Sequence, residues 1–416
     1  MAAEANNVVE AVFRRESGRI IASLIRISGS FDRAEEAMQE AFAAALASWP
    51  EKGTPQNHAA WITAAAHRKL IDQSRREKTR QEKQDALQYE TEHLRTTDAG
   101  ASDESFMHLP DDRLRLIFTC CHPALRPEAQ VSLTLRTLGG LTTIEIAKAF
   151  LVPETTVSQR IVRAKRKIEE AGIPYEVPPS ERLPERLASV QAVVYLIFNE
   201  GYLATAGDRL IRTDLCSEAV RLGRLLCELL PGEPENLGLL ALMLLHDSRR
   251  DARINKSGEL VPLEEQDRTI WHSGQIYEGL RIVEQALQAG AVGPFQLQAA
   301  IAAVHAEAKT AAETDWSQIA ALYGELARRY PSPVVELNQA VAIAMSEGFE
   351  RGLQRIDNLS GAAELQNYYL YHAARADILR RMGLREKALR EYERAAEMAT
   401  NEIEQRYLRR RIEELK

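Results

Sequence analysis

The sequence predicts an all-α protein, and three of its properties lead to that prediction. Alanine and leucine greatly outnumber the β-branched residues, and aromatic residues make up only 6% of the 416 residues. Long stretches carry apolar residues at helical spacing, and proline and glycine separate many of them. A hydrophobic fraction of 45% beside a charged fraction of 27% is typical of a globular protein with a substantial core.

The same composition argues against a membrane or secreted protein. The longest apolar runs, such as residues 237–245, have about half the length of a membrane span. The first residues show neither the basic region nor the apolar region of a secretory signal. Four cysteines are too few for a disulfide framework, which favours a reducing compartment. We therefore expect a cytoplasmic protein.

Changes in composition divide the chain into three helical blocks. A polar stretch and a segment rich in proline and glycine separate them, because both interrupt helices. Residues 107–171 have a net charge of +3 and the remainder, residues 172–416, a net charge of −7, so nucleic acid is expected to bind at the second block and not at the third. The predicted division is a domain over residues 1–80, a linker over 81–106, a domain over 107–171, a linker over 172–180 and a helical domain over 181–416.

The third block contains a faint internal repeat. Its small and aromatic residues follow the pattern of a tetratricopeptide repeat, and two alanines stand twice 34 residues upstream. The intermediate positions, Gln354 and Gly361, break the pattern, and an alanine-rich helical hairpin can match it by chance. We expect a degenerate tetratricopeptide-like α-solenoid. The matching positions are Gly383, Ala388, Tyr392 and Ala395, with Ala320 and Ala327 upstream.

Residues 32–49 predict a helix with an acidic face. Asp32 stands in N-cap position, and an apolar stripe that includes Phe42 and Trp49 recurs at helical spacing. Asp32, Glu36, Gln39 and Glu40 lie away from that stripe. Taken alone, this pattern is typical of a solvated acidic face. Paired carboxylates also suggest acid–base chemistry, but no basic or nucleophilic partner accompanies them.

A loop with two prolines and a glycine, residues 50–57, precedes a second helix that is rich in basic residues. Trp61, Ile62, Ala65 and Leu70 can form its core side. An aromatic ring beside cations is typical of single-stranded DNA binding, although Trp61 can equally be a buried core residue. The basic residues are His67, Arg68, Lys69, Arg75 and Arg76.

Residues 141–168 give the strongest local signal, that of a helix-turn-helix. Residues 141–143 cap a short helix with Glu145 near its start, and residues 151–154 form the turn. On the second helix one face is apolar, with Val157, Ile161, Ala164 and Ile168, and the other is polar and then basic. Such a second helix is suited to the major groove of DNA. The polar and basic face comprises Thr155, Ser158, Gln159, Val162, Arg163 and Arg166.

With these units in this order, the first 171 residues resemble an extracytoplasmic-function sigma factor of the sigma-70 family. Residues 32–49 resemble region 2.2, residues 61–77 resemble regions 2.3 and 2.4, and residues 141–167 resemble region 4.2. Further along, residues 106–125, 198–205 and 237–253 resemble the subgroup with a fused C-terminal tetratricopeptide-like domain, which in such groups is thought to regulate activity.

The resemblance implies two partners, core RNA polymerase and promoter DNA, and no cofactor or catalysis. One departure is the run Ala64, Ala65, Ala66 and His67, where many relatives are more polar. The residues that would meet the β′ clamp helices of the polymerase are Asp32, Glu35, Glu36, Gln39 and Glu40. The residues that would contact the minus-ten element are Asn57, His58, Trp61, Arg68, Lys69, Arg75 and Arg76, and those facing the minus-thirty-five element are Thr155, Ser158, Gln159, Arg160, Arg163 and Arg166.

Other chemistry-bearing residues fit no complete site. Cys120 and Cys121, with His122 and His108, lack the spacing of a zinc knuckle, so we expect buried thiols and no metal. No phosphate loop or nucleophile elbow is present. Candidates for a pocket in the third block are Asn199, Glu200, His246, Arg249, His305, Asp315 and Trp316.

Two rival hypotheses remain beside the sigma factor. One is a one-component helix-turn-helix regulator whose solenoid senses a small molecule. The other is a helical enzyme with Glu200 and His246 in a cleft. Within the sigma-factor hypothesis, the acidic C-terminal domain either masks the basic helix-turn-helix domain by an intramolecular contact or assists assembly with polymerase.

Overall fold

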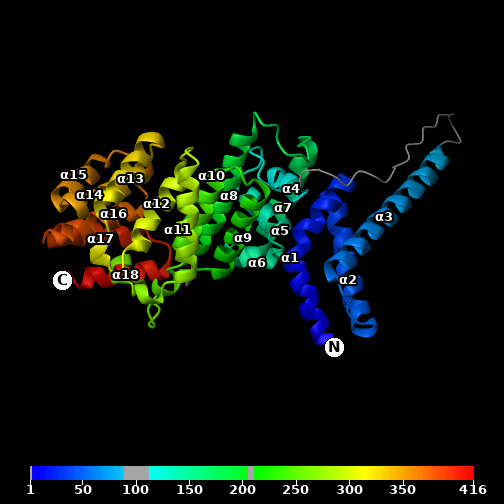
Figure 1. The fold of residues 1–416 in the computed structure, drawn as a ribbon, viewed down its shortest axis with the longest axis horizontal. Coiled ribbons are helices and arrows are strands. Elements are labelled where there is room, and N and C mark those ends of the chain that lie inside the picture. The colour runs from blue at the N-terminus through cyan, green and yellow to red at the C-terminus, as the bar shows by residue number, and fades with distance from the viewer. Residues whose placement is uncertain (1, 89–111, 151, 205–209) are drawn as a thin grey trace. The chain divides into compact units, whose positions relative to one another are not determined.

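A computed structural model describes residues 2–88, 112–150, 152–204 and 210–416. The all-α prediction is confirmed over these residues, which form helices joined by turns and short 3-10 segments (Figure 1). The described part of the chain contains no strand, and its β-type pairing is limited to an isolated bridge between Ile254 and Leu260. None of its helices is both long enough and apolar enough to cross a bilayer.

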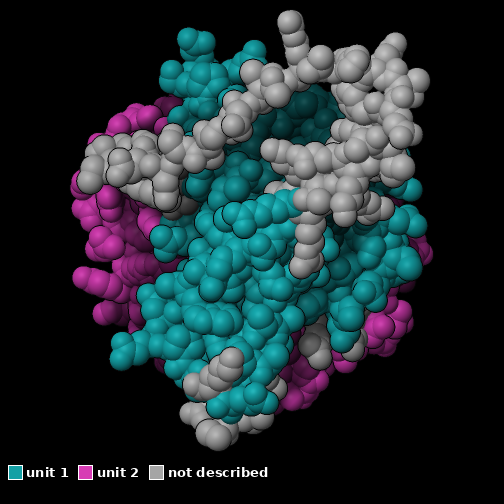
Figure 2. All heavy atoms as spheres, turned by 90° about the vertical axis from the view of Figure 1, so that its right-hand side faces the viewer, with its two compact units in different colours: residues 1–148, 152–193 teal, residues 149–151, 194–416 magenta. Residues whose placement is uncertain are grey.

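The chain divides into two compact units, shown in different colours in Figure 2. Unit 1 comprises residues 1–148 and 152–193, and unit 2 comprises residues 149–151 and 194–416. Both predicted N-terminal domains therefore belong to unit 1 apart from residues 149–151, together with the segment that follows them. The predicted domain boundaries themselves stay predictions.

Unit 1 is built from short and long helices around α1, which packs against α2, α3 and α4. Its core side chains include Leu24, Phe42 and Ile62, all nearly inaccessible to water. The ring of Phe13 meets the edge of Phe42 at 5.1 Å between centroids. The helices are α1 (Ala2–Ser28), α2 (Phe31–Lys52), α3 (His58–Gln88), α4 (Asp112–Cys120), α5 (Pro127–Thr137), α6 (Thr143–Ala149) and α7 (Glu154–Glu170), and α8 (Leu183–Tyr202) begins in unit 1.

The start of α2 corrects one expectation. Ser30, and not Asp32, is the N-cap residue, because its hydroxyl accepts the amide of Arg33 at 3.4 Å. Asp32 lies in the first turn, where a carboxylate also stabilises the helix dipole. At the other end α2 continues through Pro50 and stops at Gly53, whose φ of +82° ends the helix.

The end of α3 differs from the predicted linker. The helix continues to Gln88, so residues 81–88 are helical and not part of a flexible connection. This stretch contains neither glycine nor proline and is composed mainly of good helix formers, which explains the difference. Residues 89–111, the rest of the predicted linker and the start of the next domain with His108, lie outside the described residues.

The segment between α7 and α8 is anchored in unit 1. The Tyr175 hydroxyl lies 2.9 Å from the carbonyl of Ala22 and 3.2 Å from that of Asp112. The pKa of Tyr175 is raised because the hydroxyl is buried and lies near the Asp112 carboxylate. One side chain of the predicted linker 172–180 therefore contacts both α1 and α4.

Unit 2 is a succession of helices in which sequence neighbours pack against each other, notably α10 with α11, α13 with α14 and α16 with α17 (Figure 1). The repeat-like residues of α17, Ala388, Tyr392 and Ala395, are buried as the pattern requires. The helices are α9 (Thr213–Leu229), α10 (Pro234–Asp247), η1 (Arg250–Ala252), η2 (Leu263–Glu265), η3 (Arg268–Ile270), α11 (Ser273–Gln288), α12 (Pro294–Glu307), η4 (Ala311–Glu313), α13 (Trp316–Arg329), α14 (Pro333–Glu347), α15 (Phe349–Asn358), η5 (Ala363–Leu365), α16 (Tyr369–Arg381), α17 (Arg385–Met398) and α18 (Glu402–Glu413).

Close packing between neighbouring helices depends on small residues. A Cβ added to Gly352 of α15 would lie 2.3 Å from the Cβ of Ala344 on α14. Glycine therefore lets the two helices approach more closely than another residue would allow. The upstream members of the repeat-like pattern, Ala320 and Ala327, lie half-buried on α13. The tetratricopeptide-like character of the unit stays a prediction.

Candidate nucleic-acid interface

The helix-turn-helix of unit 1 is formed by α6 and α7. Thr142 and Glu145 make a reciprocal capping box, with the Thr142 amide 2.7 Å from the Glu145 carboxylate and the Glu145 amide 3.1 Å from the Thr142 hydroxyl. Pro153 precedes α7 and fixes the backbone for its first turn. These local interactions hold the two helices on either side of a short turn.

The two faces of α7 differ as the sequence predicts. Val157, Ile161, Ala164 and Ile168 are all buried, and Val157 is completely inaccessible. On the opposite face Val162 is 63% exposed, although it is apolar. An exposed valine among polar groups can contact a thymine methyl group in the major groove. The other exposed side chains of this face are Thr155, Ser158, Gln159, Arg163 and Arg166.

The cations of α7 are not equivalent. Arg163 forms no ion pair with another described residue, whereas Arg166 pairs with Glu170 one turn along, at 2.6 Å. The Glu170 carboxylate raises the pKa of the Arg166 guanidinium. Arg160 is half-buried. Arg163 is therefore an exposed cation of this face whose charge no described carboxylate compensates.

Two carboxylates of the acidic face of α2 form ion pairs with α7, a contact that the sequence did not predict. Lys165 of α7 places its ammonium 2.9 Å from the carboxylate of Asp32 and 2.8 Å from that of Glu35. The side chains of Lys165 and Glu35 are only 13% and 17% exposed, so this pair is shielded from water more than an ordinary surface pair, whereas Asp32 is 82% exposed. Because Lys165 is far from Asp32 and Glu35 in the sequence, periodicity within one helix gave no signal for the contact.

The remaining predicted polymerase-binding residues form no ion pair with Lys165. Glu36 and Gln39 are exposed on α2. Glu40 forms an ion pair with Lys69 of α3 at 3.1 Å, so a residue predicted to meet polymerase contacts one predicted to meet DNA. Of the five predicted side chains, Glu36 and Gln39 point into water without a described ion pair.

The loop before α3 brings three aromatic rings together. Trp49 of α2 is buried, and the rings of His58 and Trp61 each lie 5.5 Å from its indole. Asn57 caps α3, because its side-chain oxygen accepts the amide of Ala60 at 3.0 Å. Trp61 is half-buried. Its ring therefore belongs to the core of unit 1 on one side and meets water on the other.

The basic side of α3 is only partly described. Arg68 and Arg75 are exposed, whereas the side chain of Arg76 lies outside the described residues. Ala65 and Ala66 are buried, so two positions of the apolar run that departs from the sigma pattern serve the core. His67 contacts the hydroxyl of Ser23 at 3.2 Å, and burial lowers its pKa, with the charge of Arg26 adding to the effect.

The cysteines of unit 1 and two pocket candidates of unit 2 have structural surroundings. Cys120 and Cys121 are buried free thiols, and burial raises the pKa of both, that of Cys121 to about 12. Among the described residues no three His, Cys, Asp or Glu side chains gather to hold a metal ion. In unit 2, Glu200 pairs with Arg212 at 2.7 Å, and Asp315 caps α13.

Three further candidates, His246, Arg249 and His305, line one cavity of unit 2. The ring of His305 also meets that of Trp316 at 5.2 Å. His246 lies on α10, Arg249 follows that helix and His305 lies on α12, so these residues come together only in the fold.

Comparison with protein families accounts for three parts of the chain. Residues 12–80 match sigma-70 region 2, and residues 115–168 match sigma-70 region 4. Residues 186–287 match a family of unknown function, DUF6596. The order of the first two matches defines the class: the chain carries the paired domains of a sigma-70 transcription initiation factor. No solved structure matches the chain.

Whole-chain comparison then gives the family. The uncharacterized protein R00370 of Rhizobium meliloti (strain 1021) is 43% identical over 397 residues, which cover 94% of this chain and 92% of that protein. The chain belongs to the same family as this protein. A more distant relative, the probable ECF RNA polymerase sigma factor SigI of Mycobacterium tuberculosis, is 25% identical over 185 residues, 44% of this chain and 62% of the relative.

Proposed function

We propose that this protein is an extracytoplasmic-function sigma factor that binds core RNA polymerase and directs it to promoters. The observation that carries the proposal is the outward face of α7, where exposed polar side chains are followed by exposed arginines in a helix-turn-helix. The match to sigma-70 region 2 upstream of it supports a sigma factor and not an isolated DNA-binding domain.

In this proposal each surface of unit 1 has one task. Asp32, Glu35, Glu36, Gln39 and Glu40 meet the clamp helices of the polymerase β′ subunit. Thr155, Ser158, Gln159, Arg160, Arg163 and Arg166 read or hold the minus-thirty-five element, with phosphate contacts positioning the helix and base contacts giving specificity.

The region around α3 acts on the minus-ten element. An extruded base needs a pocket, because leaving the stack costs a few kcal/mol, and the half-buried Trp61 beside His58 offers a ring at the edge of such a place. Asn57 lies in the same loop, and Arg68, Lys69, Arg75 and Arg76 supply cations for the phosphates. The protein performs no catalysis itself in this proposal and works in the cytoplasm with the polymerase.

Runoff transcription with purified core polymerase tests the proposal. The full chain is the only added factor, and the templates are a promoter library. Specific transcripts are expected from the wild type and at least about tenfold fewer from Glu36→Lys. The substitution reverses the charge at the proposed interface, and a mismatched charge there costs several kcal/mol. Glu181→Lys, which changes an exposed carboxylate outside α2, is the matched control and should transcribe as the wild type does.

The same assay separates the rival hypothesis. A one-component regulator would bind duplex DNA tightly without polymerase and give no transcript with core polymerase alone. Silence of the wild type in runoff transcription, with duplex binding intact, would therefore contradict the sigma-factor proposal. Equal transcription by Glu36→Lys and wild type would contradict docking through α2.

We further propose that the C-terminal helical region controls this activity. Its net charge of −7 over residues 172–416 is opposite to that of residues 107–171, which supports a contact with the helix-turn-helix domain. The full chain is compared with a chain that ends at residue 193, after circular dichroism has verified its folding. More transcript from the short chain would identify masking, less would identify a required contact, and equal yields would contradict control by this region.

A further inference from the structure

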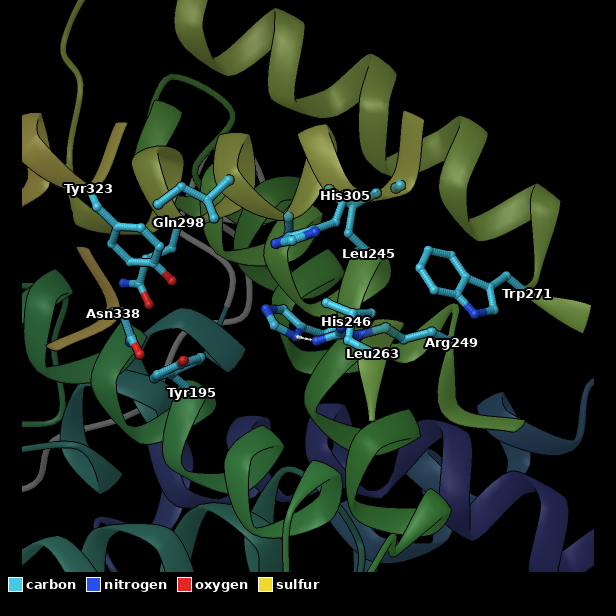
Figure 3. Close-up of a pocket in the computed structure, with 13 residues that line it drawn as sticks. Tyr195, Leu245, His246, Arg249, Leu263, Trp271, Gln298, His305, Tyr323 and Asn338 are labelled. Atoms are coloured by element: carbon cyan, nitrogen blue, oxygen red, sulfur yellow. Dashed lines mark hydrogen bonds between the residues drawn. The ribbon is translucent and has the colours of Figure 1, made fainter. Parts of the chain in front are cut away.

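Unit 2 encloses a cavity of about 310 Å³ (Figure 3). This volume is at the lower end of the range for small-molecule sites. Side chains of α8, α10, α12, α13 and α14 line it together with residues between α10 and α11. Its wall includes the rings of Tyr195, Trp271 and Tyr323, which offer flat apolar surfaces to a bound molecule.

Arg249 gives the cavity its charge. The guanidinium bonds to the ring of His246 at 3.1 Å and lies 5.7 Å from the ring of Tyr202. Within the described part of the chain Arg249 forms no ion pair, whereas its sequence neighbour Arg250 pairs with Asp247 at 3.2 Å. The cavity wall contains no carboxylate and no lysine. Arg249 thus carries a partly buried positive charge without a compensating negative one.

Neighbouring cations raise the free-energy cost of keeping the charge of Arg249 in the cavity wall. Burial lowers the pKa of Arg253 and of Arg268, and the positive charge of Arg249 adds to the effect on both. The two neighbours are held by protein oxygens: Arg253 donates to the carbonyl of Tyr202, and Arg268 donates to the carbonyls of His305 and Ala308. Arg249 is therefore the guanidinium of this group that has no oxygen partner among the described residues.

The two histidines of the wall are neutral at physiological pH. Burial holds the pKa of His246 well below its ordinary value, and burial together with Arg249 and Arg268 lowers the pKa of His305 to about 4. A guanidinium has no acceptor, so Nδ1 of His246 accepts from Arg249 and the ring proton resides on Nε2. Figure 3 shows the second ring nitrogen of His246 facing the space below His305.

His305 adds an unsatisfied group to the same space. Its Nδ1 is buried and has no hydrogen-bond partner in the structure. Leaving a buried polar nitrogen unpaired costs about 1–3 kcal/mol. Across the cavity, Figure 3 places the polar ends of Gln298 and Asn338 near the two tyrosines. The cavity thus has a donor-rich, positively charged middle and a neutral polar end.

We propose that this cavity binds a small organic monoanion, a carboxylate with a flat ring and a polar group at the opposite end. The carboxylate lies on Arg249 and Nε2–H of His246, and the ring lies between the aromatic walls. A single positive charge in the wall matches one negative charge, whereas a dianion such as a phosphate monoester would leave one charge buried without a partner. The proposal does not depend on the sigma-factor function.

Thermal unfolding of the full chain provides the first test. The probe is 4-hydroxybenzoate at millimolar concentration, and its neutral analogue 4-hydroxybenzamide is the matched control. The carboxylate is expected to raise Tm by about 2–4 °C, because a ligand that binds only the folded state stabilises it. The amide is expected to leave Tm unchanged, since it lacks the negative charge.

Substitutions then locate the site. Arg249→Gln is expected to weaken binding at least about tenfold while the Tm without ligand stays equal or rises, because an uncompensated charge has been removed. Arg249→Lys keeps the positive charge but loses the planar fork of donors, so it is expected to bind more tightly than Arg249→Gln and more weakly than the wild type. Arg281→Gln, which removes an exposed charge of α11, should bind as the wild type does.

Four outcomes would overturn the proposal. One is an equal response to the carboxylate and the amide. The second is undiminished binding by Arg249→Gln, measured by calorimetry, and the third is lost binding by Arg249→Lys in a folded protein. The last is the absence of any Tm shift with benzoate, 4-hydroxybenzoate, indole-3-acetate and hexanoate at millimolar concentration.

Discussion

The outward face of α7 and the cavity of unit 2 both depend on arginine, but they expose it to water differently. Arg163 and Arg166 lie in solvent, where charge is screened and each side chain contributes little alone. Arg249 is partly buried beside neutral histidines, where charge acts strongly over short distances. A surface that binds DNA therefore works by the sum of many weak contacts, whereas an enclosed site depends on one group.

The largest effect is expected from a negative charge placed on the buried face of α7, compared with the same charge on its exposed face. Val157→Asp places a carboxylate in the core of unit 1 and should lower the free energy of unfolding by about 3 kcal/mol or more. Ser158→Asp places it one residue further, on the exposed face, and should change that free energy by less than about 0.5 kcal/mol. Urea denaturation measures both.

Binding to promoter DNA tests whether Ser158→Asp impairs DNA recognition although it leaves the protein stable. With core polymerase present, Ser158→Asp is expected to weaken binding to promoter DNA by repulsion of the phosphates, although the protein stays folded. Unchanged promoter affinity of Ser158→Asp would contradict the placement of this face in the groove.

An intermediate effect is expected for the two arginines of α7. Arg163→Gln should weaken promoter binding about tenfold and reduce the salt dependence of binding by about one counterion. Arg166→Gln should have a smaller effect, because the Arg166 guanidinium is already paired with Glu170. Affinities measured at several salt concentrations test the difference, and a larger loss from Arg166→Gln would contradict the argument from pairing.

The smallest effect concerns the pH dependence of unit 2. The imidazole of His305 takes up a proton below about pH 6.5 in the unfolded chain but only near pH 4 in the folded one. Since the unfolded state binds more protons between these values, stability falls as pH falls through this window. His305→Phe, which keeps a ring against Trp316, should reduce that loss by about 1 kcal/mol at pH 5.5.

Denaturant titrations of wild type and His305→Phe at pH 7 and pH 5.5 give the comparison. An identical loss of stability in the two proteins would show that the proton taken up on unfolding belongs to another group. His246 is present in both proteins, and its pKa is lowered mainly by burial, with the charge of protonated His305 as a smaller cause.

The sequence predicts those features of unit 1 that a single helix encodes. The buried stripe of Val157, Ile161, Ala164 and Ile168 follows from helical spacing, as does the exposed face opposite it. The cap of α2 was misplaced at Asp32, because Ser30 and Asp32 are both good capping residues and only the geometry selects between them.

Features made by several helices could not be predicted in the same way. Lys165 was overlooked because its partners Asp32 and Glu35 lie in another domain of the sequence. His246, Arg249 and His305 were each recognised as candidates, but residue type and spacing did not show that they share one cavity. Trp271 and Tyr195 of the same wall gave no signal at all, since a lone aromatic residue is usually part of a core.

The bridge from Lys165 to α2 has a consequence for assembly. Lys165 and Asp32 are separated by 133 positions but belong to one molecule, so the lysine is present at an effective concentration that is commonly millimolar for tethered groups. If Asp32 and Glu35 meet polymerase as proposed, the same carboxylate oxygens serve two competing cations, one internal and one external. In that case the polymerase has to displace a tethered competitor, so a stronger bridge raises the polymerase concentration at which half of the molecules are engaged.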